Sequence, residues 1–201
     1  GALTFGVTTA MVFCNSREGL AAPDLQLLFA PASSSIKVVG KLDEDPGMTL
    51  SICPVRPQSR GTVMAESPDP MEKAKIRPNY FGVEDDIHVM LSGVKQGQKI
   101  FAQPALQEYS IGEAVPGKSM ETAEECVEFA KQRGVTIYHP VGTCKMGTDV
   151  MSVVDPRLKV IGVEGLRVID ASIMPGVTTG NTNAPSIMIG EKGAAMILED
   201  N

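Results

Sequence analysis

The last third of the chain carries a pattern that few folds accommodate: a short apolar strand, a glycine-rich loop and then a helix. Residues 166–170, Leu-Arg-Val-Ile-Asp, form the nearly continuous apolar run found in parallel sheets that are covered on both faces. A Gly/Thr/Pro/Asn loop follows at 171–183, and residues 185–198 predict a helix capped by Thr182 or Asn183. Such a crossover needs neighbouring parallel strands, of which the chain offers too few. The pattern therefore predicts a contribution to an incomplete α/β domain.

The first two thirds of the chain predict an antiparallel sheet with flanking helices, so the expected fold class is α+β. Alternating apolar side chains along residues 24–30 predict a strand. Two further strands are expected at 49–55 and 61–66, connected by the turn-forming residues 57–61. The proline-bearing stretch 67–78 is expected to be a surface loop.

A change of period at Asp85 predicts the first long helix. Apolar residues from Ile87 onward fall near one helical face, and Asp85 or Asp86 is a plausible N-cap. Two glycines, Gly93 and Gly97, weaken this helix and leave its end uncertain. A polar loop containing Gly and Pro is expected at 107–118.

The sequence Thr122-Ala-Glu-Glu125 is a capping box and predicts the start of a second helix. An apolar stripe at helical spacing follows it, and Gly134 supplies the stop. Residues 135–138 then predict a short β-branched strand that leads into His139.

Composition excludes several classes of function. With 43% apolar and 21% charged residues in 201, the chain is typical of a globular protein, and a net charge of −6 argues against nucleic acid. No apolar run is long enough to span a bilayer. Four scattered cysteines and two histidines make a zinc site improbable, and they favour reduced thiols in a cytoplasmic protein. Association of the whole protein with a membrane surface stays open.

Two residues could carry chemistry, and each has a plain structural alternative. His139 follows an expected strand and precedes a loop with Pro and Gly, where an imidazole could accept a proton near neutral pH. Equally, it could simply bond a neighbouring carbonyl. Asn183 could be an ordinary N-cap, or its amide could donate to an alkoxide or a substrate hydroxyl at a helix N-terminus.

The motifs around these residues resemble one known family. His139-Pro-Val-Gly-Thr-Cys-Lys-Met-Gly147, Leu166-Arg-Val-Ile-Asp-Ala-Ser172, Gly180-Asn-Thr-Asn-Ala-Pro185 and Ile189-Gly-Glu-Lys192 occur in this order. They are similar to the carboxy-terminal signature of the glucose–methanol–choline (GMC) oxidoreductases, and most of all to the choline dehydrogenases and bacterial alcohol dehydrogenases of that family. Weaker likeness extends upstream, so the resemblance covers essentially the whole chain.

The resemblance implies a role for each site residue. His139 would be the catalytic base, and Asn183, 44 residues later, would orient the alcohol oxygen. Asp170 and Ala171 would contact the ribityl–pyrophosphate part of FAD, while Ala184 and Pro185 would lie near the N1/O2 edge of the flavin.

The same resemblance implies a substrate-binding domain at 1–137 and, at 138–201, the catalytic loop with a carboxy-terminal piece of the FAD-binding domain. The reaction would be oxidation of a primary alcohol, choline-like or other, with FAD reduced. The expected partners are a small-molecule alcohol, the amino-terminal FAD-binding half and, in a homo-oligomer, further copies of the chain.

One departure from the family pattern sets the expected limits of activity. The Gly-x-Gly-x-x-Gly fingerprint that cradles the dinucleotide phosphates is absent. We therefore expect this polypeptide alone to bind flavin weakly and to be inactive. The competing hypothesis is a non-catalytic binding module or a truncated remnant of such an enzyme.

Overall fold

The structure is a computed structural model that describes residues 6, 8–33, 41–117 and 120–200. The chain divides into two compact units. The first unit comprises residues 1–58 and 81–135, and the second comprises residues 59–80 and 136–201. These units are divisions by compactness, so the functional boundary expected between 137 and 138 stays a prediction.

A three-stranded antiparallel sheet is the centre of the first unit. Its strands are β1 (Ala10–Cys14), β2 (Leu25–Ala30) and β3 (Thr49–Pro54), in the order β1-β2-β3. Leu25 and Leu27 on β2 are buried as predicted, but Gln26 between them is buried too, so burial does not alternate at this end of the strand. The strands expected at 24–30 and 49–55 are confirmed, and the antiparallel sheet confirms the expected α+β class.

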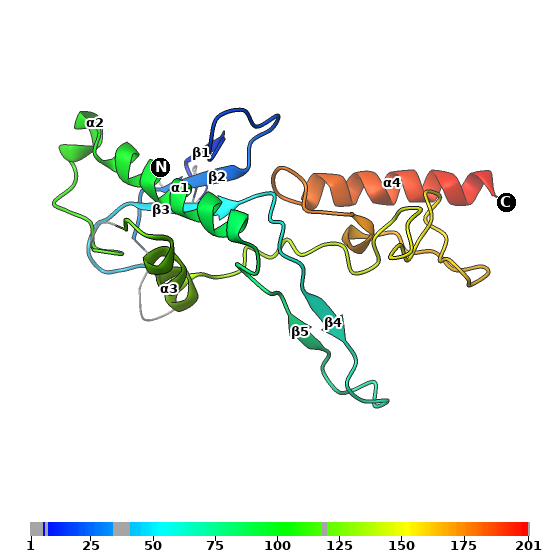
Figure 1. Cartoon of the computed structure of the whole chain (residues 1–201). Helices are drawn as coiled ribbons and strands as arrows, with labels where there is room; N and C mark the ends of the chain where they lie inside the picture. The colour runs from blue at the N-terminus through cyan, green and yellow to red at the C-terminus, as the bar shows by residue number, and fades with distance from the viewer. Residues whose placement is uncertain (1–5, 7, 34–40, 118–119, 201) are drawn as a thin grey trace. The chain divides into compact units, whose positions relative to one another are not determined.

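The helix α1 (Glu84–Phe101) packs on β2 and β3 (Figure 1). The two glycines that weaken it by propensity are the reason it can lie so close to the sheet. A Cβ atom on Gly93 would stand 2.4 Å from Ile52 Cγ2, and one on Gly97 would stand 3.1 Å from Leu50 Cδ2. Both glycines are buried, so close packing replaces the lost helix propensity.

The expected cap of α1 is wrong. The N-cap residue is Val83, which makes no side-chain cap bond, and both aspartates lie inside the first turn. There they bond elsewhere: Asp86 accepts a hydrogen bond from the Gln58 backbone N–H at 2.7 Å, and Asp85 pairs with Arg17 at 2.7 Å. Acidic residues in the first turn still interact favourably with the helix dipole.

Two further helices complete the first unit. After the short α2 (Pro104–Gln107), the expected loop continues without helix or strand through residue 117, and residue 118 lies outside the described residues. The helix α3 (Ala123–Arg133) starts with the predicted capping box, in which Thr122 Oγ1 accepts from the Glu125 N–H, and it ends at Gly134. It packs on α1 through a core of Val94, Met120 and Cys126.

A hairpin of β4 (Thr62–Met64) and β5 (Lys75–Arg77) belongs to the second unit. The strand expected at 61–66 is thus confirmed, but its partner is not β3, and the stretch 67–78 is not entirely loop. With three exposed residues, β5 is too short to show an alternation of burial. Gly61 permits the start of the hairpin, because a Cβ atom there would stand 2.1 Å from the Arg77 carbonyl oxygen.

Two strands expected from the apolar runs at 135–138 and 166–170 do not form. Residues 135–138 are irregular, and Tyr138 has a φ of 63°. In 166–170 only Arg167 forms a bridge, an isolated antiparallel one with Lys159. β-branched residues favour a strand where a partner strand supplies a continuous ladder, and among the described residues 166–170 has only this one bridge. The segments instead surround a core of Val154, Leu158, Ile173, Met174 and Ile189.

The helix α4 (Asn183–Glu199) confirms the helix expected at 185–198, and it follows the short 3₁₀ helix η2 (Ala171–Ile173). Ile189 lies in the core, and a Cβ atom on Gly193 would stand 2.4 Å from Ile169 Cγ2. Most other side chains of α4 are exposed. Within the described ranges, neither this helix nor any other is long and apolar enough to cross a membrane.

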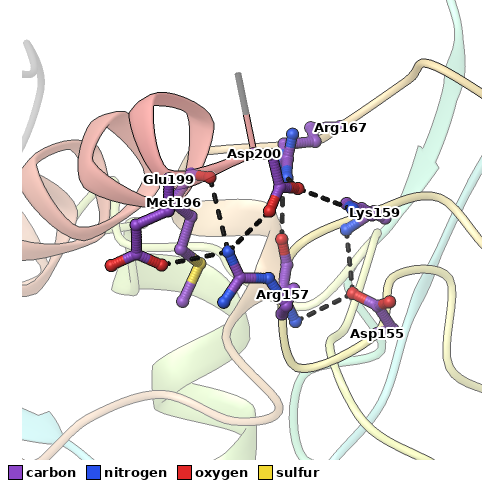
Figure 2. Close-up of polar contacts among 7 residues, drawn as sticks. All are labelled: Asp155, Arg157, Lys159, Arg167, Met196, Glu199 and Asp200. Atoms are coloured by element: carbon purple, nitrogen blue, oxygen red, sulfur yellow. Dashed lines mark hydrogen bonds and ion pairs between the residues drawn. The ribbon is translucent and has the colours of Figure 1, made fainter.

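A charge cluster fixes the end of α4 (Figure 2). Asp200 pairs with Lys159 at 2.6 Å, with Arg157 at 2.9 Å and also with Arg167. Asp155 orders the same loop, since its carboxylate accepts from the backbone N–H groups of Arg157 at 2.8 Å and Lys159 at 2.9 Å. Hydrogen bonds from Lys159 and Arg167 hold the pKa of Asp200 well below its ordinary value.

Replacing Gly93 by Ala tests the close packing of α1. Overlap with Ile52 and Leu25 costs more than the gain in helix propensity, so we expect destabilisation by about 1 kcal/mol in urea unfolding. Gly190→Ala is the matched control, because a Cβ atom there meets nothing within 4 Å and α4 should gain stability. Stabilisation by Gly93→Ala would contradict the packing argument.

Replacing Asp200 by Asn tests the charge cluster. The depressed pKa of Asp200 means that its stabilisation is present above the unfolded-state pKa and is lost as pH falls through the folded-state pKa. The wild-type Tm should therefore exceed the variant's at about pH 6, and the difference should shrink below about pH 3 and in about 1 M salt.

The control for this experiment is Glu164→Gln, since Glu164 makes no ion pair with any described residue. A Tm difference for Asp200→Asn that does not change between neutral and acid pH would contradict the assignment.

Candidate active site

Two backbone hydrogen bonds join the motif segments 139–147 and 166–185. The N–H of Cys144 donates to the Ser172 carbonyl at 3.0 Å, and the N–H of Met146 donates to the Ile173 carbonyl at 2.7 Å. Gly142, with a φ of 90°, lets the first segment pass close to the second, because a Cβ atom there would stand 3.2 Å from the Met174 carbonyl oxygen. Segments about 30 residues apart in sequence thus lie side by side.

His139 is half-buried and lies between Tyr138, which has a positive φ, and Pro140. Both ring nitrogens have polar partners from the loop before α4. Nδ1 lies 2.7 Å from Thr182 Oγ1, and Nε2 lies 2.8 Å from the Asn181 side-chain nitrogen. The backbone N–H of Thr182 also points at Nδ1, at 3.3 Å. The imidazole is therefore fixed in orientation.

Thr182 occupies the N-cap position of α4, one of the two positions predicted, but its hydroxyl does not cap the helix. The side chain is buried, with 7% of its surface exposed, and its hydroxyl contacts the imidazole instead. Its carbonyl accepts two hydrogen bonds from Ser186, from the backbone N–H at 3.0 Å and the hydroxyl at 2.6 Å. The first turn of α4 therefore holds Thr182, which in turn holds His139.

Asn183 is the first residue of α4 and is exposed. The side chains within hydrogen-bonding distance of His139 are those of Asn181 and Thr182, and Asn183 is not among them. Sequence reasoning missed these two residues, although both belong to the same Gly180–Pro185 motif. Spacing along a chain gives the neighbourhood of a partner, but not the direction of each side chain where a loop becomes a helix. The pairing of His139 with Asn183 stays a prediction.

The four residues expected to contact flavin lie at the N-terminal ends of η2 and α4. Asp170 is exposed and accepts the Ser172 N–H at 2.7 Å; the hydrogen bonds from Ser172 lower the pKa of Asp170. Ala171 begins η2, and Ala184 and Pro185 lie in the first turn of α4. The N–H groups of that turn have no acceptor within the helix, so it suits an electron-rich group.

The rest of the described chain holds no competing chemical site. No group of three metal-ligating side chains occurs among the described residues, and all four cysteines are free thiols. A cavity of about 190 Å³ in the first unit is lined by Arg17, Asp24 and Asp86 among others. Its buried carboxylates have structural partners, such as the Ser16 N–H and hydroxyl on Asp24 at 2.7 and 2.6 Å.

Comparison with known proteins agrees with the motifs. A family model described as GMC oxidoreductase matches residues 57–190. The chain is 43% identical to an alcohol dehydrogenase [acceptor] from Pseudomonas putida. That match covers 98% of this chain and 36% of the relative. It is 42% identical to an oxygen-dependent choline dehydrogenase from Brucella melitensis, in a match that covers 92% of this chain and 34% of the relative.

Solved structures give the same result. Pyridoxine 4-oxidase from Mesorbium loti matches with a TM-score of 0.83 and 27% identity, over 94% of this chain and 37% of that one. An Aspergillus oryzae formate oxidase matches with a TM-score of 0.76 and 26% identity, over 90% of this chain and 32% of that one. The chain spans about a third of the length of these relatives. The resemblance drawn from the motifs is confirmed: the chain belongs to the GMC oxidoreductase family.

Proposed function

We propose that this chain is the part of an FAD-dependent alcohol oxidoreductase that carries the catalytic base. The reaction is oxidation of a primary alcohol, choline-like or other, to the aldehyde. The observation that carries the proposal is the fixed imidazole of His139 beside the first turn of α4. The names of the relatives, an alcohol dehydrogenase and a choline dehydrogenase, support the substrate class.

His139 removes the hydroxyl proton of the alcohol. A neutral imidazole within hydrogen-bonding distance accepts this proton, and the alkoxide character that develops pushes electron density toward loss of hydride from the α-carbon. FAD, when bound, supplies the acceptor for that hydride. Loss of one proton to His139 and of one hydride to that acceptor converts the alcohol to the aldehyde.

A carboxamide completes the proposed site by orienting the alcohol oxygen. Asn183 takes this role in our proposal because it lies 44 residues after His139, the family spacing. Asn181 is the carboxamide that contacts Nε2. A substrate hydroxyl that reaches Nε2 takes the place of that contact.

The proposed flavin contacts are those that the family resemblance implies. Asp170 and Ala171 lie toward the ribityl–pyrophosphate part, and Ala184 and Pro185 toward the N1/O2 edge. The N-terminal end of α4 stabilises negative charge there, as helix dipoles do. The described residues fit this use because Ala184 and Asn183 are exposed in the first turn.

The remaining two thirds of a protein of this kind supply the phosphate cradle that this sequence lacks. Exposed apolar side chains on α4 support a contact with such a part. Ile187, Met188 and Leu198 are 60%, 57% and 78% exposed, which is unusual for an apolar helix of a globular protein.

Replacing His139 by Ala tests the base. In a complex of this chain with the FAD-binding part, we expect kcat to fall by a factor of about 10² to 10⁴, with FAD still bound, because the proton acceptor is lost. His88→Gln is the matched control: it removes the other histidine, which is exposed on α1, and should leave kcat unchanged. Wild-type kcat in the His139→Ala variant would remove the basis of the proposal.

Flavin retention tests whether this chain needs the FAD-binding part in order to bind flavin and to be active. We expect the purified 201-residue chain to be colourless and inactive with alcohols in a dye-reduction assay, since it has no phosphate cradle. Co-expression with the part of the Pseudomonas putida relative that lies outside the match should give a yellow complex that reduces dye with alcohols. A complex that forms but never turns over would favour the binding-module alternative.

A further inference from the structure

We propose that the exposed side of α4 binds the amino-terminal FAD-binding part, and that Glu191 on this side forms an ion pair with an arginine or lysine of that part. The docking surface consists of Ile187, Glu191, Ala194 and Leu198, which lie at helical spacing along α4. This contact rests on the proposed function for the existence of the FAD-binding part, but on no step of the reaction.

Burial divides α4 into two sides. Ile189 and Gly193 are buried, and Met196 packs against the same core, so these residues mark the inner side. Figure 1 shows the loops of the second unit lying along one side of the helix. Glu191 is two residues from Ile189 and from Gly193, which is about 200° around the helix axis. The docking surface therefore lies opposite the core, and all four of its side chains are exposed.

The composition of α4 indicates that its exposed side is covered in the whole protein. Only three of its 17 residues are charged, and these are Glu191, Lys192 and Glu199. A helix that is apolar all round is characteristic of a buried position, whereas a surface helix carries polar residues on its outer side. The chain spans about a third of the length of its relatives, so a part large enough to cover this side lies outside the match.

Glu191 is the one charge on the docking surface, and α4 offers it no cation. The residues three and four positions away, which a helix brings alongside, are Ile187, Met188, Ala194 and Ala195. Lys192 is the next residue along the chain and points to a different side of the helix. No ion pair joins Glu191 to any described residue, whereas Glu199 pairs with Arg157 at 3.0 Å.

A carboxylate that is covered by an apolar partner needs a cation, because an unpaired charge is costly to remove from water. The partner therefore presents an apolar surface with one basic side chain opposite Glu191. A second copy of this chain does not meet this requirement. In a two-fold contact the same surface lies on both sides, and the docking surface contains no basic residue. Both Glu191 carboxylates would then stay unpaired.

The test uses this chain co-expressed and purified with the part of the Pseudomonas putida relative that lies outside the match. Glu191→Gln keeps the shape of the side chain and removes its charge. We expect the Kd of the complex, measured by sedimentation on dilution, to rise by a factor of about 30 or more, the loss typical when one partner of a buried ion pair is removed. The matched control is Glu164→Gln, the same chemical change at an exposed residue outside α4, which should leave the Kd unchanged.

A double-mutant cycle identifies the cation. Each arginine and lysine of the amino-terminal FAD-binding part is replaced by glutamine in turn. We expect one replacement to raise the Kd as much as Glu191→Gln does, and to raise it no further in a complex that already carries Glu191→Gln. The Tm of the isolated chain should be the same with and without Glu191→Gln, since an exposed side chain without a described partner contributes little to its stability.

If the separate parts do not co-purify, they are joined in one polypeptide in the order of the relative. The Tm of that polypeptide should then fall on Glu191→Gln, while the Tm of the isolated chain stays the same.

An unchanged Kd, or an unchanged Tm of the joined polypeptide, on Glu191→Gln would overturn the proposal. A dimer of the isolated chain that Ile187→Ser dissociates would assign the docking surface to a second copy instead. None of these measurements needs an alcohol or turnover. A complex that depends on Glu191 but oxidises no alcohol would therefore support this contact and contradict the proposed function.

Discussion

The hydrogen bonds from Cys144 to Ser172 and from Met146 to Ile173 are the constraint on which the candidate site depends. The second unit has no sheet beneath its site segments in the described residues, only isolated bridges and a small core. Those two bonds align the loop after His139 with the turn before α4, and the burial of Ile173 and Met174 excludes water from between them. Loops that would ordinarily be mobile are ordered by backbone pairing and a few buried side chains.

The helix α4 transmits this order to His139. Its first turn holds Thr182 through Ser186, and its last residues are held by the cations of the 157–167 loop. A helix is stiff along its axis, so attachment at both ends fixes the direction of the first turn as well as its place. The orientation of one imidazole thus follows from contacts at both ends of a 17-residue helix. This arrangement is what a proton acceptor requires, because proton transfer is sensitive to small errors in geometry.

Sequence alone predicted the elements whose signals are local. The apolar spacing along β2, the capping box of α3 and the stop at Gly134 all depend on neighbouring residues, and the elements that they predict are confirmed. The runs at 135–138 and 166–170 failed because a strand exists only with a partner, which propensity does not reveal. The glycines of α1 were read as a weakness because their neighbours on β3 are distant in sequence. Motif order located the site, but Asn181 and Thr182 needed side-chain directions that spacing cannot give.

Two thiols of the first unit have a practical consequence. Cys53 on β3 and Cys126 on α3 are buried, and burial raises the pKa of both above the ordinary thiol value. A thiol reagent reacts with an accessible thiolate, so neither sulfur reacts until its surroundings open. Cys126 reports separation of α3 from α1, and Cys53 reports disturbance of the sheet. The chain therefore contains two native cysteines from which the rates of local opening can be measured without introducing another.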